Sequence, residues 1–265
     1  MKSEVPIFGY HDLSDGEKNL NPFHAPYVPL KTKFCEQMQW LSMNGYRTLT
    51  LDDLINHNVP QKSVVLTFDD GHISNYELAF PILKKFNFVA TFFIVPKYIG
   101  SKNYITREQI LEMTKQGMRF ESHSLTHTHI LSLSKGEIDR EVHQSKEEIQ
   151  SLLNSEVNHF SVPYGFYNRY LVRCVEKAGY KSLVTENFGY YVANKNPFPI
   201  LPRFTVKSRM DTGKFKEIAE RRKGQLLTYY SKALCLQNVK RVLGYRMYIR
   251  LKSLILNSPP SDIYK

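Results

Sequence analysis

Cysteine is scarce in this sequence. The 265 residues include three cysteines, Cys35, Cys174 and Cys235, which lie far apart and are odd in number. This pattern argues against a disulfide framework and is typical of a reducing compartment. No Cys-x-x-Cys pair occurs, so a zinc site built from thiolates is excluded and any metal must be held by histidine and carboxylate.

Long apolar runs are also missing. No stretch reaches the roughly 18 apolar residues that a membrane-spanning helix needs. The chain begins with charged residues that lead into Pro6, which is not the pattern of a secretory signal. The composition, 42% hydrophobic and 23% charged, is ordinary for a globular protein. We therefore expect a soluble, cytoplasmic protein.

The net charge of +11 is unevenly distributed along the chain. Residues 216–265 contain 11 lysines and arginines against 3 acidic residues, which leaves +3 for the first 215 residues. We predict a folded domain over residues 1–215 and a basic, amphipathic helical extension over residues 216–265, broken near Gly244. The extension either packs on the domain with a solvated basic face or lies on anionic lipid. No nucleic-acid-binding module is apparent, so we expect no nucleic acid as a partner.

Apolar runs and helical patterns alternate through most of the chain. Strands are predicted over 5–10, 46–51, 63–68, 89–95, 118–122, 160–162 and 182–185, and helices over 34–43, 51–56, 76–86, 106–117, 134–154 and 170–177. This alternation predicts an α/β fold with a parallel sheet, either open or closed into a barrel. Active sites of such folds lie at the carboxyl ends of the strands.

Four predicted strand ends carry polar or turn-forming residues. They are Tyr10-His11, Asp69-Asp70-Gly71, His123 with His127, and Pro163-Tyr164-Gly165. Each also has a structural interpretation, because Asp-Asp-Gly and Pro-Tyr-Gly favour turns and isolated histidine pairs are common. Two histidines four residues apart can, however, face one metal. His129, two residues beyond His127, is ranked below these two histidines.

Three of these motifs, in this order, resemble those of a known family. Thr67-Phe68-Asp69-Asp70-Gly71, His123-Ser124-x-x-His127 and Pro163-Tyr164-Gly165 look like the motifs of the polysaccharide deacetylases of carbohydrate esterase family 4, the NodB-homology family. The resemblance covers about residues 5 to 206. It implies a distorted (β/α) barrel that removes acetyl groups from saccharides with a divalent metal ion.

The resemblance also implies roles for individual residues. Asp70, His123 and His127 would bind the metal, Asp69 would be the general base, and Tyr164 would offer its backbone N–H to the oxyanion. Pro163 and Gly165 would contact the substrate in the same turn. Water activated by the metal would attack the acetyl amide. The nitrogen and oxygen ligands suit zinc best, with cobalt, nickel or iron as alternatives.

The sequence departs from the family pattern at two places. Ser161 stands where the family usually has an arginine that orients the base, and no histidine follows His159 to act as the acid. In the circularly permuted branch that resembles poly-N-acetylglucosamine deacetylases, the acid histidine lies on the first strand. We therefore assign His11 as the acid, with Tyr10 beside it at the substrate. Arg203 is either the replacement for the missing arginine, near base and substrate, or a surface residue.

The sequence thus predicts a metal-dependent hydrolase that removes acetyl groups from N-acetylated sugars of the N-acetylglucosamine type, in a polysaccharide or glycan precursor. One alternative is an amidohydrolase of a small non-sugar amide. A second alternative, motivated by Ser161, is a saccharide-binding protein without activity. Phe166 and Tyr167 are either a platform for sugar rings or part of the core. If the extension binds lipid, the protein would lie at the inner membrane face.

Overall fold

The computed structural model describes residues 4–16, 24–56, 59–192 and 196–222, and scattered positions between 224 and 255. Its helices are α1 (Lys31–Met43), α2 (Leu51–Ile55), α3 (Phe80–Lys85), α4 (Arg107–Lys115), α5 (Lys135–Leu153), α6 (Arg169–Lys177) and α7 (Thr212–Ala219). Its strands are β1 (Glu4–Val5), β2 (Ile7–Tyr10), β3 (Arg47–Leu49), β4 (Ser63–Phe68), β5 (Thr91–Ile94), β6 (Arg119–Ser122), β7 (His159–Ser161), β8 (Ser182–Val184), β9 (Tyr191–Val192), β10 (Ile200–Leu201) and β11 (Phe204–Thr205). The predicted alternation of strands and helices is confirmed.

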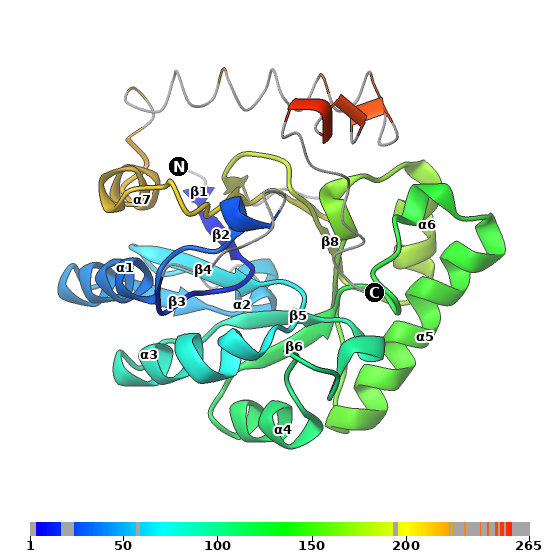
Figure 1. Cartoon of the computed structure of the whole chain (residues 1–265), viewed down its shortest axis with the longest axis horizontal. Helices are drawn as coiled ribbons and strands as arrows, with labels where there is room; N and C mark the ends of the chain where they lie inside the picture. The colour runs from blue at the N-terminus through cyan, green and yellow to red at the C-terminus, as the bar shows by residue number, and fades with distance from the viewer. Residues whose placement is uncertain are drawn as a thin grey trace.

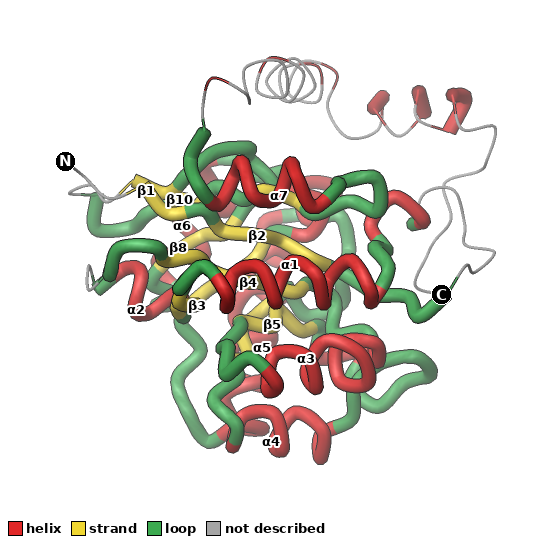
Figure 2. The backbone as a smooth tube through the Cα atoms, turned by 90° about the vertical axis from the view of Figure 1, so that its left-hand side faces the viewer, coloured by secondary structure: helices red, strands yellow, loops and turns green. Residues whose placement is uncertain are grey.

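The main sheet is parallel and curls round on itself, with helices on its outside (Figures 1 and 2). Its strand order is β10-β8-β7-β6-β5-β4-β2-β11, with β3 also paired to β4. The two end strands belong to one stretch of chain, because only Pro202 and Arg203 separate β10 from β11. Residues 200–205, here called the closing segment, pair with β8 through Ile200 and Leu201 and with β2 through Phe204 and Thr205. The two ends of the curled sheet therefore meet at one short segment, and the predicted (β/α) barrel class is confirmed.

Strand β4 shows how the sequence divides the core. All six of its residues are buried. Val64, Leu66 and Phe68 pack in the larger cluster, between sheet and helices, whereas Val65 packs in a second cluster with residues such as Phe93. This alternation follows from the two-residue period of a strand. It directs Thr67 and Asp69 to the same side as Val65, the inside of the barrel.

The starts of two helices and the division of the first predicted strand have clear local causes. Thr106 with Gln109 and Ser134 with Glu137 form complete capping boxes at the starts of α4 and α5. The strand predicted over 5–10 is divided at Pro6, which lacks the N–H that a strand ladder requires. Among the described residues, no helix is long and apolar enough to cross a membrane.

Helix α7 crosses the predicted boundary between residues 215 and 216. It packs against α1, and its Phe215, Ile218 and Ala219 are buried in the larger core cluster. The folded body therefore continues to the end of α7. Most of the predicted extension, including its expected break at Gly244, lies outside the described residues, and the positions described between 224 and 255 are helical.

Candidate metal centre and active site

The two adjacent aspartates at the end of β4 face the same site because the backbone turns between them. Asp69 continues the strand, and its N–H donates to the carbonyl of Tyr10 at 2.9 Å. Asp70 has a φ of +73°, in the left-handed region that favours glycine, and so does Gly71. An ordinary strand would send the two carboxylates to opposite faces. The strained turn instead brings both into one buried centre.

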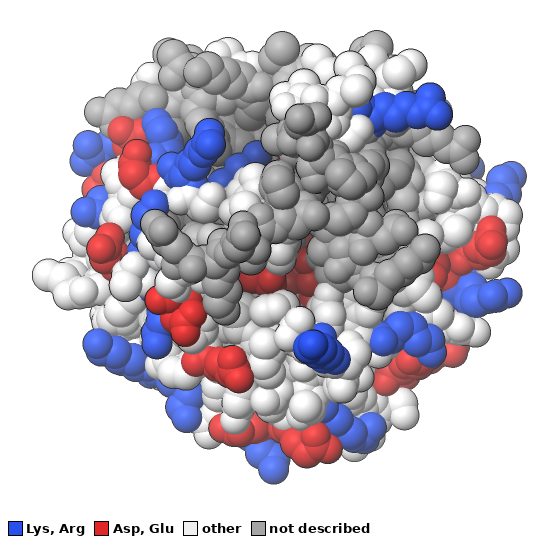
Figure 3. Space-filling model, in the orientation of Figure 1, with Lys and Arg blue, Asp and Glu red and all other residues white. Residues whose placement is uncertain are grey.

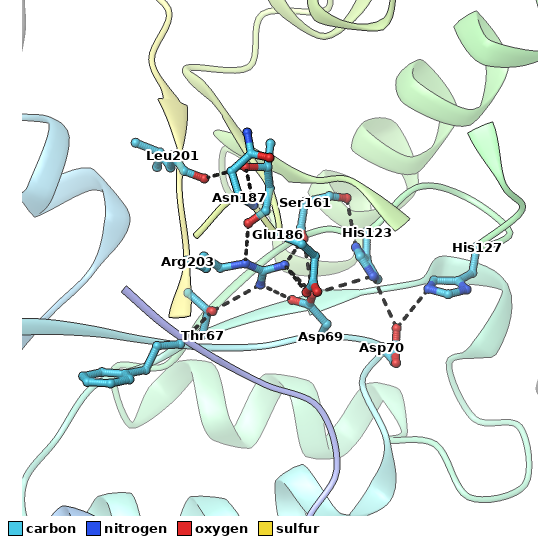
Figure 4. A network of polar contacts seen from close by, with 12 residues as sticks. Thr67, Asp69, Asp70, His123, His127, Ser161, Glu186, Asn187, Leu201 and Arg203 are labelled. Carbon is cyan, nitrogen blue, oxygen red and sulfur yellow. Dashed lines mark hydrogen bonds and ion pairs between the residues drawn. The ribbon is translucent and has the colours of Figure 1, made fainter. Parts of the chain in front are cut away.

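Asp70, His123 and His127 converge on one point (Figure 4). Oδ1 of Asp70 lies 3.3 Å from Nε2 of His123 and 3.1 Å from Nε2 of His127. All three side chains are buried. The predicted metal ligands are therefore brought together although they come from two different strand ends.

This group has the chemistry of a cation site. Nδ1 of His123 lies 2.9 Å from the carbonyl of Ser161, which can only accept, so Nδ1 carries a proton and Nε2 is the ring nitrogen directed at Asp70. Burial lowers the pKa of His123, but Asp69 and Asp70 outweigh it and raise this pKa, so the two carboxylates favour a positive charge at Nε2, which a proton or a metal ion supplies. Burial raises the pKa of Asp70, but His127 and His123 outweigh it and hold this pKa well below its usual value. Burial lowers the pKa of His127, which favours the neutral form that binds metal.

The loop that carries His127 is held by a carboxylate that sequence reasoning missed. Glu141, a buried residue of α5, accepts hydrogen bonds from the N–H groups of Leu125 and Thr126 at 2.9 and 3.0 Å and from the Thr126 hydroxyl at 2.7 Å. Ser124 and His127 in this loop both have positive φ, 65° and 60°. Glu141 therefore stabilises a strained loop conformation that aims His127 at Asp70. No sequence motif marks it, because it lies within an ordinary helical pattern.

Asp69 is bound by Arg203 in a bidentate ion pair. Nη1 and Nη2 of Arg203 each donate to one carboxylate oxygen at 2.7 Å. Nη1 also donates to Thr67 Oγ1, Nη2 to Ser161 Oγ, and Nε to the carbonyl of Thr185. All five N–H groups of the guanidinium are thus engaged, in a side chain that is 1% exposed. Arg203 is not a surface residue.

The ion pair sets the charge of Asp69. Burial raises the pKa of this carboxyl, but the charge of Arg203, the charge of His123 and the hydrogen bonds from Arg203 outweigh it and lower the pKa. The Ser161 hydroxyl lies 3.1 Å from Arg203 Nη2 and 3.4 Å from Asp69 Oδ2, so serine occupies the side of Asp69 where the family resemblance expects an arginine. The guanidinium reaches this place from the closing segment of the barrel instead.

His11 and Glu186 lie close to Asp69. One ligand atom from each of these three residues falls within 4.8 Å of the others. Glu186 Oε1 is also 3.6 Å from Nη2 of Arg203. Glu186 was missed at the sequence level, although it directly follows the predicted strand 182–185 and so occupies a strand-end position like the others. His11, the predicted acid, therefore lies close to the Asp69 carboxylate.

The turn Pro163–Gly165 borders the Asp70 group. Tyr164 has a φ of +62°, and its ring centroid lies 4.9 Å from that of His127. A Cβ added at Gly165 would lie 2.6 Å from Cβ of Glu186, so no larger residue fits there. Pro163 is buried, whereas the Tyr164 side chain is 38% exposed. Of the two residues predicted to contact the substrate in this turn, Pro163 is buried and Gly165 is partly exposed.

The position of Tyr10 differs from the prediction. It was expected at the substrate, but it is fully buried between Phe34 and Phe68, and its hydroxyl donates to Gln37 at 2.8 Å. The strand period explains this, because adjacent Tyr10 and His11 point to opposite faces of the sheet. Only His11 reaches the site.

Aromatic side chains lie around the site, and we call Tyr27, Tyr164 and Phe166 the aromatic surround. Tyr27 lies beside His11 at 5.1 Å between ring centroids, and Phe166 lies 5.6 Å from His129. The ring centroid of Tyr248, a residue of the extension, lies 6.2 Å from that of Phe166. Burial and, to a smaller extent, the charge of Glu186 raise the pKa of Tyr248. His129 therefore lies near this aromatic surround rather than within the Asp70 group. Tyr167 instead packs on the core, and its hydroxyl accepts from Asn187.

The fold and the site define a class: parallel (β/α) barrels with a buried Asp-His-His group and a second carboxylate at the carboxyl ends of their strands. The model of the polysaccharide deacetylase family matches residues 56–183. YxkH of Bacillus subtilis, which is named as a polysaccharide deacetylase, is 35% identical over 192 residues, which cover 71% of this chain and 66% of YxkH. The chain belongs to the polysaccharide deacetylase family.

Two further proteins are similar to the chain. The poly-β-1,6-N-acetyl-D-glucosamine N-deacetylase of Staphylococcus epidermidis is 27% identical over 199 residues, 68% of this chain and 67% of that protein. The structure of the Streptococcus pyogenes deacetylase PplD in complex with acetate matches with a TM-score of 0.74 and 27% identity, over 83% of this chain and 99% of PplD. The chain thus spans about two thirds of the length of the curated relatives.

Proposed function

We propose that the protein is a metal-dependent deacetylase that removes acetyl groups from N-acetylated sugars of the N-acetylglucosamine type, in a polysaccharide or glycan precursor. The observation that carries the proposal is the pairing of two carboxylates with different partners. Asp70 faces two histidines, and Asp69 faces a buried guanidinium. Hydrolysis of an amide needs both an electrophilic centre and a base, and this arrangement supplies a place for each.

Asp70, His123 and His127 would hold the ion, with zinc the best match to two nitrogens and one oxygen. When bound, such an ion lowers the pKa of water and polarises a carbonyl oxygen. Asp69 would take the proton as water attacks, because Arg203 keeps it ionised and fixes both of its oxygens. The bidentate contact also restricts rotation of the carboxylate, so the base is oriented before substrate arrives.

His11 would give a proton to the departing amine. One of its ring nitrogens lies within 4.8 Å of a carboxylate oxygen of Asp69, so acid and base would act on the same bound group. Histidine suits this role because its ordinary pKa lies near neutrality. The backbone N–H of Tyr164 would stabilise the negative charge that develops on the carbonyl oxygen, a type of contact worth about 3 kcal/mol. The positive φ of this residue is consistent with a turn held for that purpose.

The aromatic surround supports a saccharide rather than a small amide as substrate. Tyr27, Tyr164 and Phe166 offer apolar faces beside the centre, which suit stacking against sugar rings. A relative that is named as a poly-β-1,6-N-acetyl-D-glucosamine N-deacetylase points to the same substrate class. The bidentate contact of Arg203 with Asp69 weakens the case for a saccharide-binding protein without activity, since that alternative was based on the missing arginine.

Acetate release tests the proposal directly. The zinc-loaded protein would be incubated with β-1,6- and β-1,4-linked N-acetylglucosamine oligomers, an O-acetylated oligosaccharide and a simple N-alkyl acetamide. We expect acetate from N-acetylglucosamine oligomers and its loss after chelation. Faster release from the acetamide would favour the small-amide alternative. Glycan binding without acetate at any pH between 5 and 9 would favour the non-catalytic one.

Replacement of Arg203 tests whether it orients the base. Arg203→Lys keeps the charge but cannot make the bidentate contact, so we expect kcat to fall about ten- to a hundredfold while zinc content is unchanged. Arg203→Ala should be worse, and the double variant Arg203→Ala/Ser161→Arg should regain part of the loss, because position 161 borders the same carboxylate. A kcat within twofold of wild type in Arg203→Lys would contradict this role.

Glu141 is predicted to maintain metal affinity from outside the ligand set. Glu141→Ala leaves the buried N–H groups of Leu125 and Thr126 without an acceptor. We expect zinc to bind about 10- to 100-fold more weakly, measured by competition with a fluorescent chelator. Glu148→Ala on the same helix is the control, since Glu148 pairs only with exposed Lys97 among the described residues. Equal zinc affinity in the two variants would refute the prediction.

A further inference from the structure

The chain beyond α7 is cationic without interruption. From Arg221 to Ser261 the sequence contains nine lysines and arginines and no aspartate or glutamate. On the body of the protein, by contrast, basic and acidic side chains are interspersed over the face drawn in Figure 3. A long run of residues with positive charge attracts a surface of negative charge.

The same segment exposes large apolar side chains. Met247, Leu251, Leu254 and Ile255 are 53%, 41%, 77% and 81% exposed, and all four are helical. Their spacing of i, i+4, i+7 and i+8 places them on one side of a helix. Arg250, also helical and exposed, falls at the border of that side. Single exposed apolar residues are common, but four on one helical face mark an interaction surface.

We propose that this face, the apolar stripe of Met247, Leu251, Leu254 and Ile255, lies on the surface of a membrane that contains anionic lipid. The interface of such a membrane offers an apolar layer for the stripe and phosphate groups for the flanking cations. A second copy of this chain is a poorer partner, because it would bring the same uninterrupted positive charge against the first.

The proposed contact also bears on the position of the site. Tyr248 is the next residue in the sequence after Met247 of the stripe. Its ring centroid lies 6.2 Å from that of Phe166, the residue after the turn Pro163–Gly165. Tyr164 in that turn contacts His127. The membrane surface and the metal centre would therefore be joined by a short series of contacts, which would keep the site close to saccharide that is attached to the membrane. The membrane contact itself does not rest on the proposed activity.

Flotation of the full chain with vesicles tests the inference. Vesicles of phosphatidylcholine with about 30% phosphatidylglycerol, the kind of anionic surface that attracts basic segments, are compared with phosphatidylcholine alone. We expect binding to the anionic vesicles only, weakened by added salt. The double variant Leu254→Glu/Ile255→Glu should bind at least about tenfold more weakly. Arg250→Glu should bind more weakly as well, by loss of attraction alone.

Met43→Glu is the matched control, because Met43 on α1 is 77% exposed and lies outside the extension. It should bind vesicles like the wild type, and all variants should keep the wild-type melting temperature and acetate release from soluble oligomers. Equal binding of wild type to both vesicle types, or undiminished binding of the double variant, would overturn the inference. So would a dimer, seen by light scattering, that the double variant abolishes, since the stripe would then bind a second copy.

Discussion

Asp69→Asn is expected to lower kcat about a thousandfold while the zinc content stays at its wild-type level. Asparagine keeps the size of the side chain but cannot accept a proton at neutral pH. The Asp70 ligand group is left intact, because Asp69 lies 3.9 Å from His123 Nε2 and is engaged by Arg203 rather than by the ligands. Acetate release and metal analysis on the same preparation separate the two effects.

The same substitution should also reduce stability. Arg203 would keep its charge in a buried position without the bidentate partner, and breaking a buried pair typically costs 3–5 kcal/mol. The melting temperature should therefore fall, and kcat must be measured where circular dichroism shows the variant folded. Turnover within tenfold of wild type by folded, zinc-loaded Asp69→Asn would rule out Asp69 as the base.

His127→Ala is expected to lose both metal and turnover. It removes one of three ligand atoms that lie within 4.8 Å of one another, and leaves His123 and Asp70 as a two-ligand site. Two ligands rarely retain zinc against a chelator. We expect zinc per chain to drop from about one to near zero after dialysis, with acetate release below detection. Elemental analysis and the acetate assay measure the two quantities.

His129→Ala is the matched control for this experiment. It removes the same side chain two positions further along, where the ring packs near Tyr164 and Phe166 rather than near Asp70. Zinc content should be unchanged, and any effect should appear in KM for oligosaccharides. If His129→Ala lost the metal and His127→Ala retained it, the ligand set proposed here would be wrong.

These two experiments distinguish the parts of the site because the fold keeps them apart. Asp69 and Asp70 are neighbours in sequence, yet each has its own partners, Arg203 for one and two histidines for the other. A backbone turn at Asp70, with a φ of +73°, makes this division possible. The sequence Asp-Asp-Gly predicts a turn there, but it does not say which aspartate faces which partner.

The sequence was sufficient for the framework and for the list of candidate ligands. Apolar runs and helical patterns predict the alternating elements, because both patterns depend on neighbours within a few residues. The motifs at strand ends resemble those of a known family, and that resemblance implied Asp70, His123 and His127 as ligands; parallel strands that end at one edge of the barrel are consistent with it. The sequence also placed Tyr10 at the substrate, where the strand period turns it into the core.

Only the tertiary structure decided the environment of each group. Arg203 reaches Asp69 across 134 positions of sequence, and Glu141 reaches the His127 loop from a neighbouring helix. Glu186 meets Arg203 and His11 only because the closing segment brings β8 and β2 together. Periodicity and motifs describe short distances along the chain, whereas charge, hydrogen bonding and orientation in a buried site depend on contacts between distant segments. For that reason the residue types were readable from the sequence, and their pairing was not.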